Sequence, residues 1–222
     1  MSSDRDPRLR PTFDPDRDLV TGTEELRALA HPLRLRLLGL LRLDGPSTAT
    51  RLAQRCGESS GLTSYHLRQL AAAGFVEDAD PSDLAGTPAR GRERWWKAAR
   101  PSTHAERPPA GDAEGTAVSA DYLRAVIAVY ADRARQWLTT EHTWPEEWQE
   151  LSGIGDVALR LSAAEARRFR LELSGLLGRY RSHDPSEAPG SGDVPGDAVV
   201  VSMQYQLFPD PEQDPPRSPD RR

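Results

Sequence analysis

The sequence has 222 residues, which is long enough for one large domain or two small ones. Hydrophobic residues make up 37% of it, a low fraction that predicts some disordered segments. No run of about eighteen apolar residues occurs, which excludes a membrane-spanning helix. The single cysteine, Cys56, excludes an intrachain disulfide and fits a reducing compartment.

The net charge of −5 is unevenly distributed along the chain. Residues 1–20 carry −1, residues 21–100 carry +3 with twelve basic against nine acidic side chains, and residues 101–222 carry −7. A basic segment joined to an acidic one is typical of a polyanion-binding domain linked to a different module. All basic residues except Lys97 are arginines, as in proteins of GC-rich genomes, so the arginine content alone does not indicate nucleic-acid contact.

Stretches rich in proline and charge divide the chain into two ordered modules. The predicted parts are a disordered N-terminal arm at 1–20, a first module at 21–100, a linker at 101–115, a second module at 116–208 and a disordered tail at 209–222. The arm lacks the apolar stretch of a secretory signal, so we expect a cytoplasmic protein with no membrane contact.

The first module is predicted to contain helices followed by a β-hairpin. Leucines at helical spacing and capping residues indicate the helices. The predicted starts and stops, in chain order, are Thr23, His31-Pro32, Ser47 or Thr48, Gly57, Ser59 or Ser60, and Gly74. Residues 75–76 and 94–97 are predicted strands that enclose a loop at 80–91. Trp95 and Trp96 point to opposite faces of the second strand, so one is expected in the core and the other exposed or against the second module.

The second module opens with a predicted amphipathic helix at residues 117–139, followed by a short helical turn near Trp148. Residues 156–161 and 198–208 alternate between apolar and polar side chains and predict strands. Between them, Ser162 and Glu165 form the pattern of a capping box, which predicts the start of another helix.

Three segments of the first module occur in a specific order and spacing. They are Leu29-Ala30-His31-Pro32-Leu33-Arg34-Leu35-Arg36-Leu37-Leu38, then Leu52-Ala53, and then Ser64-Tyr65-His66-Leu67-Arg68-Gln69-Leu70 with Ala73-Gly74-Phe75-Val76. Together they resemble the ArsR-like winged helix-turn-helix transcriptional regulators, in their actinobacterial type. The resemblance covers about a third of the chain.

This resemblance implies a homodimer that binds double-stranded DNA as a transcriptional regulator in the cytoplasm, associated with the nucleoid. A recognition helix would enter the major groove and the hairpin wing would reach the flanking backbone. The expected fold class is therefore α+β: an N-terminal winged helix-turn-helix, then a long helix and a small strand-helix-strand C-terminal module.

Helical geometry independently predicts the DNA-binding face. At about 100° per residue, the small and polar residues of the helix after Ser59 lie opposite its leucines. Three arginines alternate along the predicted wing, so they share one side of it. The predicted DNA-binding residues are Ser60, Gly61, Ser64, Tyr65, Arg68, Arg90, Arg92 and Arg94. A merely solvated helix would show the same pattern, but the preceding helix, the Gly57 turn and the following hairpin favour DNA contact. We expect His66 to pack rather than to bind DNA.

The sequence lacks the ligand pattern of the metal-sensing members of the ArsR-like superfamily that it resembles. Those members carry paired cysteines, or carboxylates and histidines on a terminal helix, whereas Cys56 has no cysteine partner and is expected to be a buried small residue. His104, His142 and His183 are scattered singly. We therefore expect no metal and no cofactor.

Two interpretations are open for the second module: its long helix dimerises, or that helix only covers the core of its own module. The strand-helix-strand end is interpreted either as core or as a domain that binds a small-molecule effector. The aromatic residues for such an apolar site are Trp137, Trp144, Trp148, Phe169 and Tyr180.

Two other functions compete with DNA-binding regulation: a non-catalytic adaptor whose winged helix binds protein, and an enzyme tethered by the first module. The basic wing argues against the adaptor. No catalytic residue is predicted, since a glycine-rich phosphate loop, a His/Glu metal pair and a nucleophile near a base are all missing from the sequence.

Overall fold

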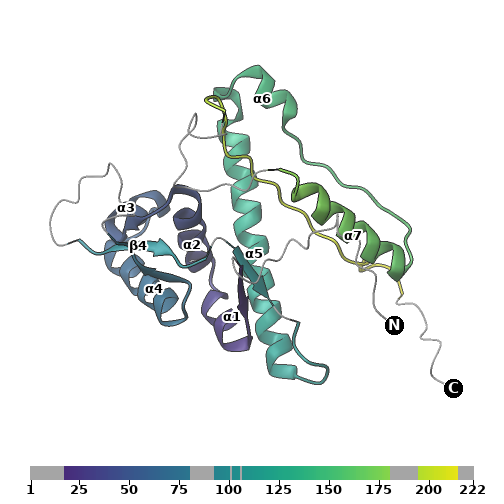
Figure 1. Ribbon diagram of the computed structural model, residues 1–222, viewed down its shortest axis with the longest axis horizontal. Helices are drawn as coiled ribbons and strands as arrows, with labels where there is room; N and C mark the ends of the chain where they lie inside the picture. The colour runs from purple at the N-terminus through teal and green to yellow at the C-terminus, as the bar shows by residue number, and fades with distance from the viewer. Residues whose placement is uncertain (1–17, 81–92, 101, 106, 181–194, 215–222) are drawn as a thin grey trace.

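The computed structural model describes residues 18–80, 93–100, 102–105, 107–180 and 195–214. The first module gathers on the left in Figure 1, with α2 between the α3–α4 pair and the long helix of the second module. Its elements are α1 (Thr23–Leu29), α2 (Pro32–Asp44), β2 (Ser47–Thr48), α3 (Ala49–Cys56), α4 (Ser60–Ala72), β3 (Val76–Asp78) and β4 (Trp95–Ala98). Helices followed by a hairpin were predicted, and β2 is an addition too short to show a sequence pattern.

Capping residues fix where the helices of this module begin and end. Ser59 Oγ accepts a hydrogen bond from the backbone N of Leu62 at 3.2 Å and starts α4. Thr48 and His31 cap α3 and α2 in the same way. Gly57 ends α3 with φ 71°, a left-handed conformation that a residue with a Cβ rarely adopts. These starts and stops confirm the predictions for α2, α3 and α4. Thr23 was predicted to cap the first helix, but it is the first residue of α1, and the N-cap, Gly22, has no side chain to make a cap hydrogen bond.

A three-stranded antiparallel sheet in the order β2-β4-β3 closes the module, with β4 in the centre. Trp96 is 3% exposed and packs into the leucine core of the helices together with Phe75 and Val76. Trp95 is 8% exposed, and the guanidinium of Arg51 covers its ring at 4.8 Å. The prediction that one of these tryptophans is exposed or packed on the second module was therefore wrong. The side chain of Arg51, from α3, covers Trp95 and so shields the second face of β4 from solvent.

The residues flanking the first module pair with each other. β1 (Asp18–Thr21) and β5 (Ser102–Ala105) form a two-stranded parallel sheet. Arg42 of α2 donates from Nε to the Arg100 carbonyl at 2.9 Å and from Nη2 to Thr103 Oγ1 at 2.7 Å. The prediction of a disordered arm at 1–20 was wrong for residues 18–20, and the predicted linker at 101–115 contains a strand, because each strand supplies the hydrogen-bonding partner of the other.

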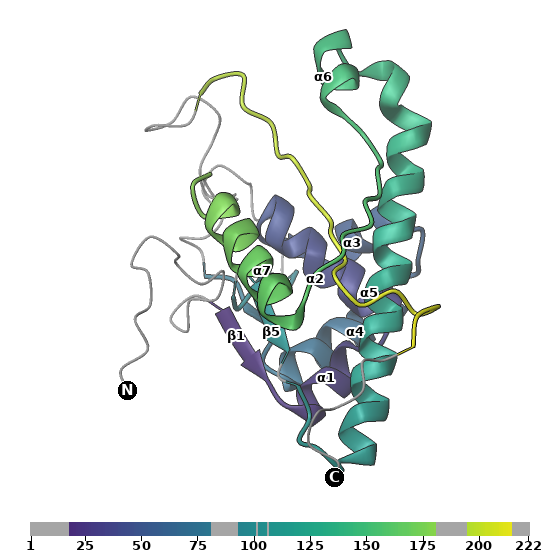
Figure 2. The ribbon, with the colours of Figure 1, turned by 90° about the vertical axis from the view of Figure 1, so that its right-hand side faces the viewer.

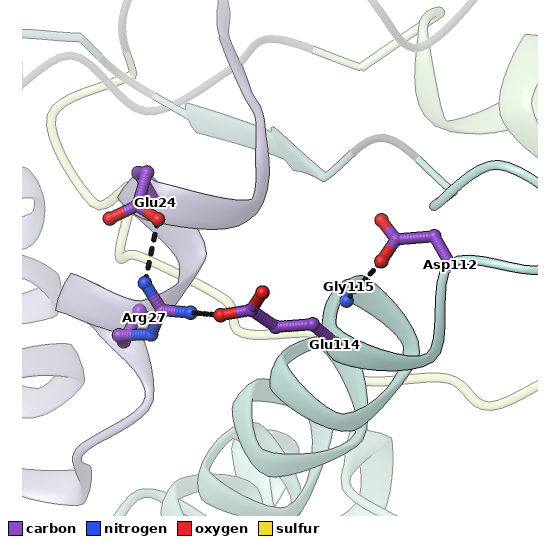
Figure 3. Close-up of polar contacts among 5 residues, drawn as sticks. All are labelled: Glu24, Arg27, Asp112, Glu114 and Gly115. Atoms are coloured by element: carbon purple, nitrogen blue, oxygen red, sulfur yellow. Dashed lines mark hydrogen bonds and ion pairs between the residues drawn. The ribbon is translucent and has the colours of Figure 1, made fainter.

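The long helix α5 (Ala113–Thr140) begins inside the predicted linker and runs along α1 and α2. Figure 3 shows how its start is held: Arg27 of α1 pairs with both Glu24 and Glu114, at 2.7 and 2.6 Å. In the same view, the Asp112 carboxylate accepts a hydrogen bond from Gly115 N at 2.8 Å and caps the helix. Farther along, the Tyr122 side chain packs against the core of the first module.

Beyond α5 the described chain consists of short helices and extended segments. A 3₁₀ turn (Glu141–Thr143) leads to α6 (Glu146–Leu151), which folds back at the end of α5 in both Figures 1 and 2. The capping box of Ser162 and Glu165 opens α7 (Ala163–Leu177), as predicted. None of the helices in the described part of the chain is long and apolar enough to cross a membrane.

The predicted strands at residues 156–161 and 198–208 are absent from this structure. Both segments are extended, but neither pairs with a neighbouring strand, and apolar side chains such as Val157 (76% exposed) and Val201 (71% exposed) face outward. The prediction of a strand-helix-strand module was therefore wrong. Alternation creates an apolar side, but a strand also needs a backbone partner, which these segments lack within the described chain.

Candidate nucleic-acid interface

The helix α4 has one buried and one exposed side. Thr63, His66, Leu67 and Leu70 are buried against the core. The predicted contact residues lie on the other side: Ser60, Gly61, Tyr65 and Arg68 are exposed, and Ser64 is half-buried. An added Cβ at Gly61 would meet no atom within 4 Å, so the start of this helix offers open backbone to an approaching surface. The orientation of α4 agrees with the predicted recognition face.

An open hollow of about 260 Å³ lies beside this face. Two predicted residues of α4, Ser64 and Arg68, border it together with Arg94, which immediately precedes β4. The structure therefore brings predicted recognition-helix and wing residues to one surface. The other lining residues are Thr48, Ala49, Thr50, Glu93 and Trp96.

Arg94 has two close partners in the hairpin. Its Nε and Nη2 donate to the Asp78 carboxylate at 2.5 and 3.0 Å, and its Cζ lies 3.9 Å from the ring centroid of Trp96. Hydrogen bonding to Arg94 holds the pKa of Asp78 below its usual value, so this carboxylate stays charged and the ion pair persists under mildly acidic conditions. Arg90 and Arg92, the other predicted wing residues, lie outside the described residues.

The comparison with known protein families matches the first module. A sequence model described as a helix-turn-helix domain matches residues 29–79. These residues include α2, α3, α4 and β3 and therefore hold the predicted recognition face. The chain carries a helix-turn-helix domain. Such a domain indicates a DNA-binding regulator. A comparison with curated proteins found no match.

Behind the recognition face of the helix-turn-helix domain, two histidine rings meet. The ring centroids of His31 and His66 are 4.5 Å apart, and those of Tyr65 and His66 are 5.2 Å apart in a T-shaped arrangement. Burial, followed by the nearby charge of Arg34, lowers the pKa of His31. The pKa of His66 is lowered first by burial and then by the charges of His31 and Arg34. The packing role predicted for His66 agrees with its 5% exposure.

Four residues at or beside the hollow were not predicted as site residues. Thr50, Glu93 and Trp96 line it, and Asp78 pairs with its lining residue Arg94. Thr50 Oγ1 and Glu93 Oε1 approach to 3.5 Å across the hollow, from α3 and the residue two before β4. A sequence signal existed only for Asp78, which follows the first predicted strand and has the opposite charge to Arg94. Using that signal requires the strand register, which is not readable when the hairpin loop is long.

The residues that the sequence offered as metal ligands or as the lining of an effector site lie outside the hollow beside α4. Cys56, at the end of α3, is half-buried, and burial raises the pKa of its thiol. In the described part of the chain no three His, Cys, Asp or Glu residues are grouped as metal ligands. The predicted aromatic set is only partly assembled. Trp144 lies 5.8 Å from Trp137 and 6.3 Å from Trp148 between ring centroids, whereas Phe169 and Tyr180 belong to α7 and the residues after it.

Proposed function

We propose that the chain is a sequence-specific DNA-binding transcriptional regulator of the ArsR-like winged helix-turn-helix kind, acting as a non-catalytic homodimer. The observation that carries this proposal is the shared surface of α4 and the hairpin. Arg68 of the matched helix-turn-helix domain and Arg94 beside it border one hollow, next to exposed small residues of α4.

The proposed docking places the start of α4 in the major groove. Ser60 and Gly61 carry little bulk, so the first turn approaches the duplex closely, and the positive end of the helix dipole favours phosphate. Arg68, two turns farther on, is long enough to reach a guanine edge or a phosphate oxygen. Arg94, with Arg90 and Arg92 of the wing, contacts the flanking backbone in this arrangement.

The homodimer part of the proposal is supported by α5. Leu123 and Ile127 lie one turn apart on this helix and are 52% and 51% exposed, and Leu138 near its end is 61% exposed. Exposed leucine and isoleucine side chains along a long helix favour a helix-helix interface. Dimerisation therefore has more support than the alternative that α5 only covers its own module.

The experiment compares DNA binding by the wild-type chain, Arg68→Ala and the triple variant Arg90→Ala/Arg92→Ala/Arg94→Ala. The probes are a duplex selected by the wild-type chain from a random-sequence pool and an unselected mixed-sequence duplex. Arg124→Ala is the matched control, because Arg124 is an exposed arginine of α5 whose partner, Asp121, is on the same helix.

We expect Arg68→Ala to lose about 1–3 kcal/mol, mainly on the selected duplex. The triple variant should weaken binding to both duplexes and flatten the dependence of log K on log salt by about 0.9 for each phosphate that is no longer neutralised. Arg124→Ala should bind like the wild type. If neither interface variant differs from wild type in gel shift, the assigned DNA-binding face is wrong.

A further inference from the structure

We propose that Asp78 is a positioning residue for DNA recognition, because it holds the guanidinium of Arg94 in place for its contact with DNA. This inference rests on the proposed function, in which Arg94 faces DNA. It gives an acidic residue at the edge of the interface a favourable role in binding a polyanion.

Asp78 contacts one edge of the planar Arg94 guanidinium, and Trp96 contacts its face. The Asp78 carboxylate accepts hydrogen bonds from Nε and Nη2 at 2.5 and 3.0 Å, with one oxygen for each nitrogen. The Trp96 ring lies against the guanidinium, 3.9 Å from Cζ to its centroid. Trp96 is itself 3% exposed and belongs to the central strand, where its register partners are Ser47 and Asp78. The ring is therefore a rigid support for a side chain that would otherwise sample many rotamers.

Asp78 leaves the outer edge of the guanidinium available for recognition. It uses the Nε–H group and one N–H group of Nη2. Asp78 does not use the second N–H group of Nη2 or the N–H groups of Nη1. The second N–H group of Nη2 and the parallel N–H group of Nη1 form the pair that binds two phosphate oxygens. Because Arg94 borders the same hollow as Ser64 and Arg68, this fixed group adjoins the surface that α4 presents.

The alternative is that the ion pair only closes the hairpin. The side chains of Arg94 and Asp78 are 54% and 64% exposed, and ion pairs this exposed contribute little to stability. The same two strands are also joined by the Lys97–Glu77 pair at 3.6 Å. We therefore expect the hairpin to stay folded without Asp78, so that the loss of Asp78 mainly affects the position of Arg94.

A positioning role for Asp78 and a purely electrostatic effect of its charge predict opposite signs for the change in DNA affinity when Asp78 is removed. If only charge matters, removing a carboxylate near bound DNA strengthens binding to every sequence. If Asp78 positions Arg94, its removal weakens binding, because the arginine must then be ordered when the complex forms. The sign of the change distinguishes the roles without requiring an exact magnitude.

The test measures fluorescence anisotropy of labelled duplexes with the full-length chain. One duplex is selected by the wild-type chain from a random-sequence pool, and the other is an unselected mixed-sequence duplex. The variants are Asp78→Ala, Arg94→Ala and the double variant. Glu77→Ala is the matched control, since it removes one carboxylate from the same strand but from a pair with Lys97. Asp78→Asn keeps the shape of the side chain and loses its charge, and thermal unfolding is followed for every variant.

We expect Asp78→Ala to weaken binding to the selected duplex on the order of tenfold. Asp78→Asn should weaken it less, because its amide oxygen still accepts one hydrogen bond. Glu77→Ala should bind as tightly as the wild type or slightly more tightly. In the double variant, the loss should equal that of Arg94→Ala alone, because Asp78 acts only through Arg94.

Two results would overturn the inference and leave the proposed function intact. One is unchanged or tighter binding by Asp78→Ala when Arg94→Ala binds weakly. The other is an additional loss in the double variant, which would mean that Asp78 acts through the hairpin fold. A wild-type affinity of Arg94→Ala is a third result that overturns the inference alone. Failure of the proposed function is distinct: the wild-type chain would select no duplex, or neither Arg68→Ala nor the triple variant would bind more weakly than the wild type.

Discussion

The rings of His31 and His66 contact each other in a tilted arrangement, with centroids 4.5 Å apart and 39° between their planes, where the start of α2 meets the buried side of α4. The Nδ1 atom of His31 accepts a hydrogen bond from Leu33 N at 3.1 Å and caps α2. Protonation of that nitrogen would remove the cap. A charge on either ring would also face the other ring and the nearby guanidinium of Arg34. Both rings are therefore best accommodated in their neutral form.

The first prediction concerns pH. The pKa values of His31 and His66 are lowered in the folded chain from an ordinary value of 6.5. The unfolded chain therefore binds more protons below that value, and folding stability falls as the pH falls. The stabilisation is fully present above about pH 6.5 and is lost as the pH falls through the lower, folded-state values. Urea unfolding followed by circular dichroism between about pH 8 and pH 5 checks this.

The matched variants are His66→Phe, which keeps an aromatic ring against His31, and His142→Phe on the exposed 3₁₀ turn. The decrease in unfolding free energy toward acid should shrink in His66→Phe and persist in His142→Phe. An unchanged pH dependence in His66→Phe would contradict the prediction.

The second prediction concerns the support of the recognition helix. Leu67 is 0% exposed and fills the core on the buried side of α4, next to the exposed Arg68. Leu67→Ala should lower the free energy of unfolding by about 2–5 kcal/mol, since it leaves a cavity. Leu62→Ala on the same helix, where the side chain is 40% exposed, should cost much less. Equal losses in the two variants, measured by urea unfolding, would show that α4 does not pack as described.

The third prediction concerns the N-cap of α4. Ser59→Ala removes the acceptor for Leu62 N and should cost about 0.5–2 kcal/mol of stability. Because the same turn carries Ser60 and Gly61, DNA affinity should also fall. Ser162→Ala removes the equivalent cap of α7 and serves as the control. It should leave binding to the selected duplex unchanged, and a similar loss of affinity in both variants would refute the local effect.

The fourth prediction concerns the start of α5. A Cβ at Gly115 would lie 2.9 Å from Asp112 Cγ and 3.0 Å from Pro108 Cβ. Gly115→Ala should therefore displace the capping carboxylate and destabilise the chain by about 1–3 kcal/mol. Gly61→Ala makes the same change in open space on α4 and should be neutral or stabilising by up to about 1 kcal/mol. Thermal unfolding compares the two, and a stable Gly115→Ala would count against the described cap.

The fifth prediction concerns the proposed homodimer. We expect a dimer mass in light scattering, with Ile127→Asp shifting the chain toward monomer because a charge would enter the apolar interface. Leu151→Asp changes a residue of α6 that is 78% exposed and should leave the mass unchanged. A monomer mass for the wild-type chain would reject the dimer.

Local sequence signals predicted the helices of the first module well. The side chain of Ser59, the leucine spacing of α4 and the glycine at position 74 all act within a few residues, so a single sequence contains them. The division of α4 into a buried and an exposed side was predictable for the same reason. It follows directly from the helical period.

Features that depend on distant partners were not predictable. β1 and β5 pair across more than eighty residues of chain, and proline and charge beside each strand indicated disorder instead. Trp95 is buried by Arg51 of another element, and Arg94 is paired with Asp78 across the hairpin. Conversely, the alternation of apolar and polar residues at 198–208 predicted a strand, because such alternation indicates one apolar side. It does not indicate whether the segment has a backbone partner.

The parallel β1–β5 pair has a mechanical consequence for the proposed regulator. The chain enters and leaves the helix-turn-helix module at adjacent points. Arg42 of α2 holds the exit segment, and Arg27 joins α1 to the start of α5. These contacts favour movement of the domain together with α5 as one rigid body over independent movement of the domain on a flexible linker. In a dimer built on α5, the span between the two recognition helices would then be a fixed length, and operators whose half-sites are moved apart or rotated by one base pair would be bound poorly.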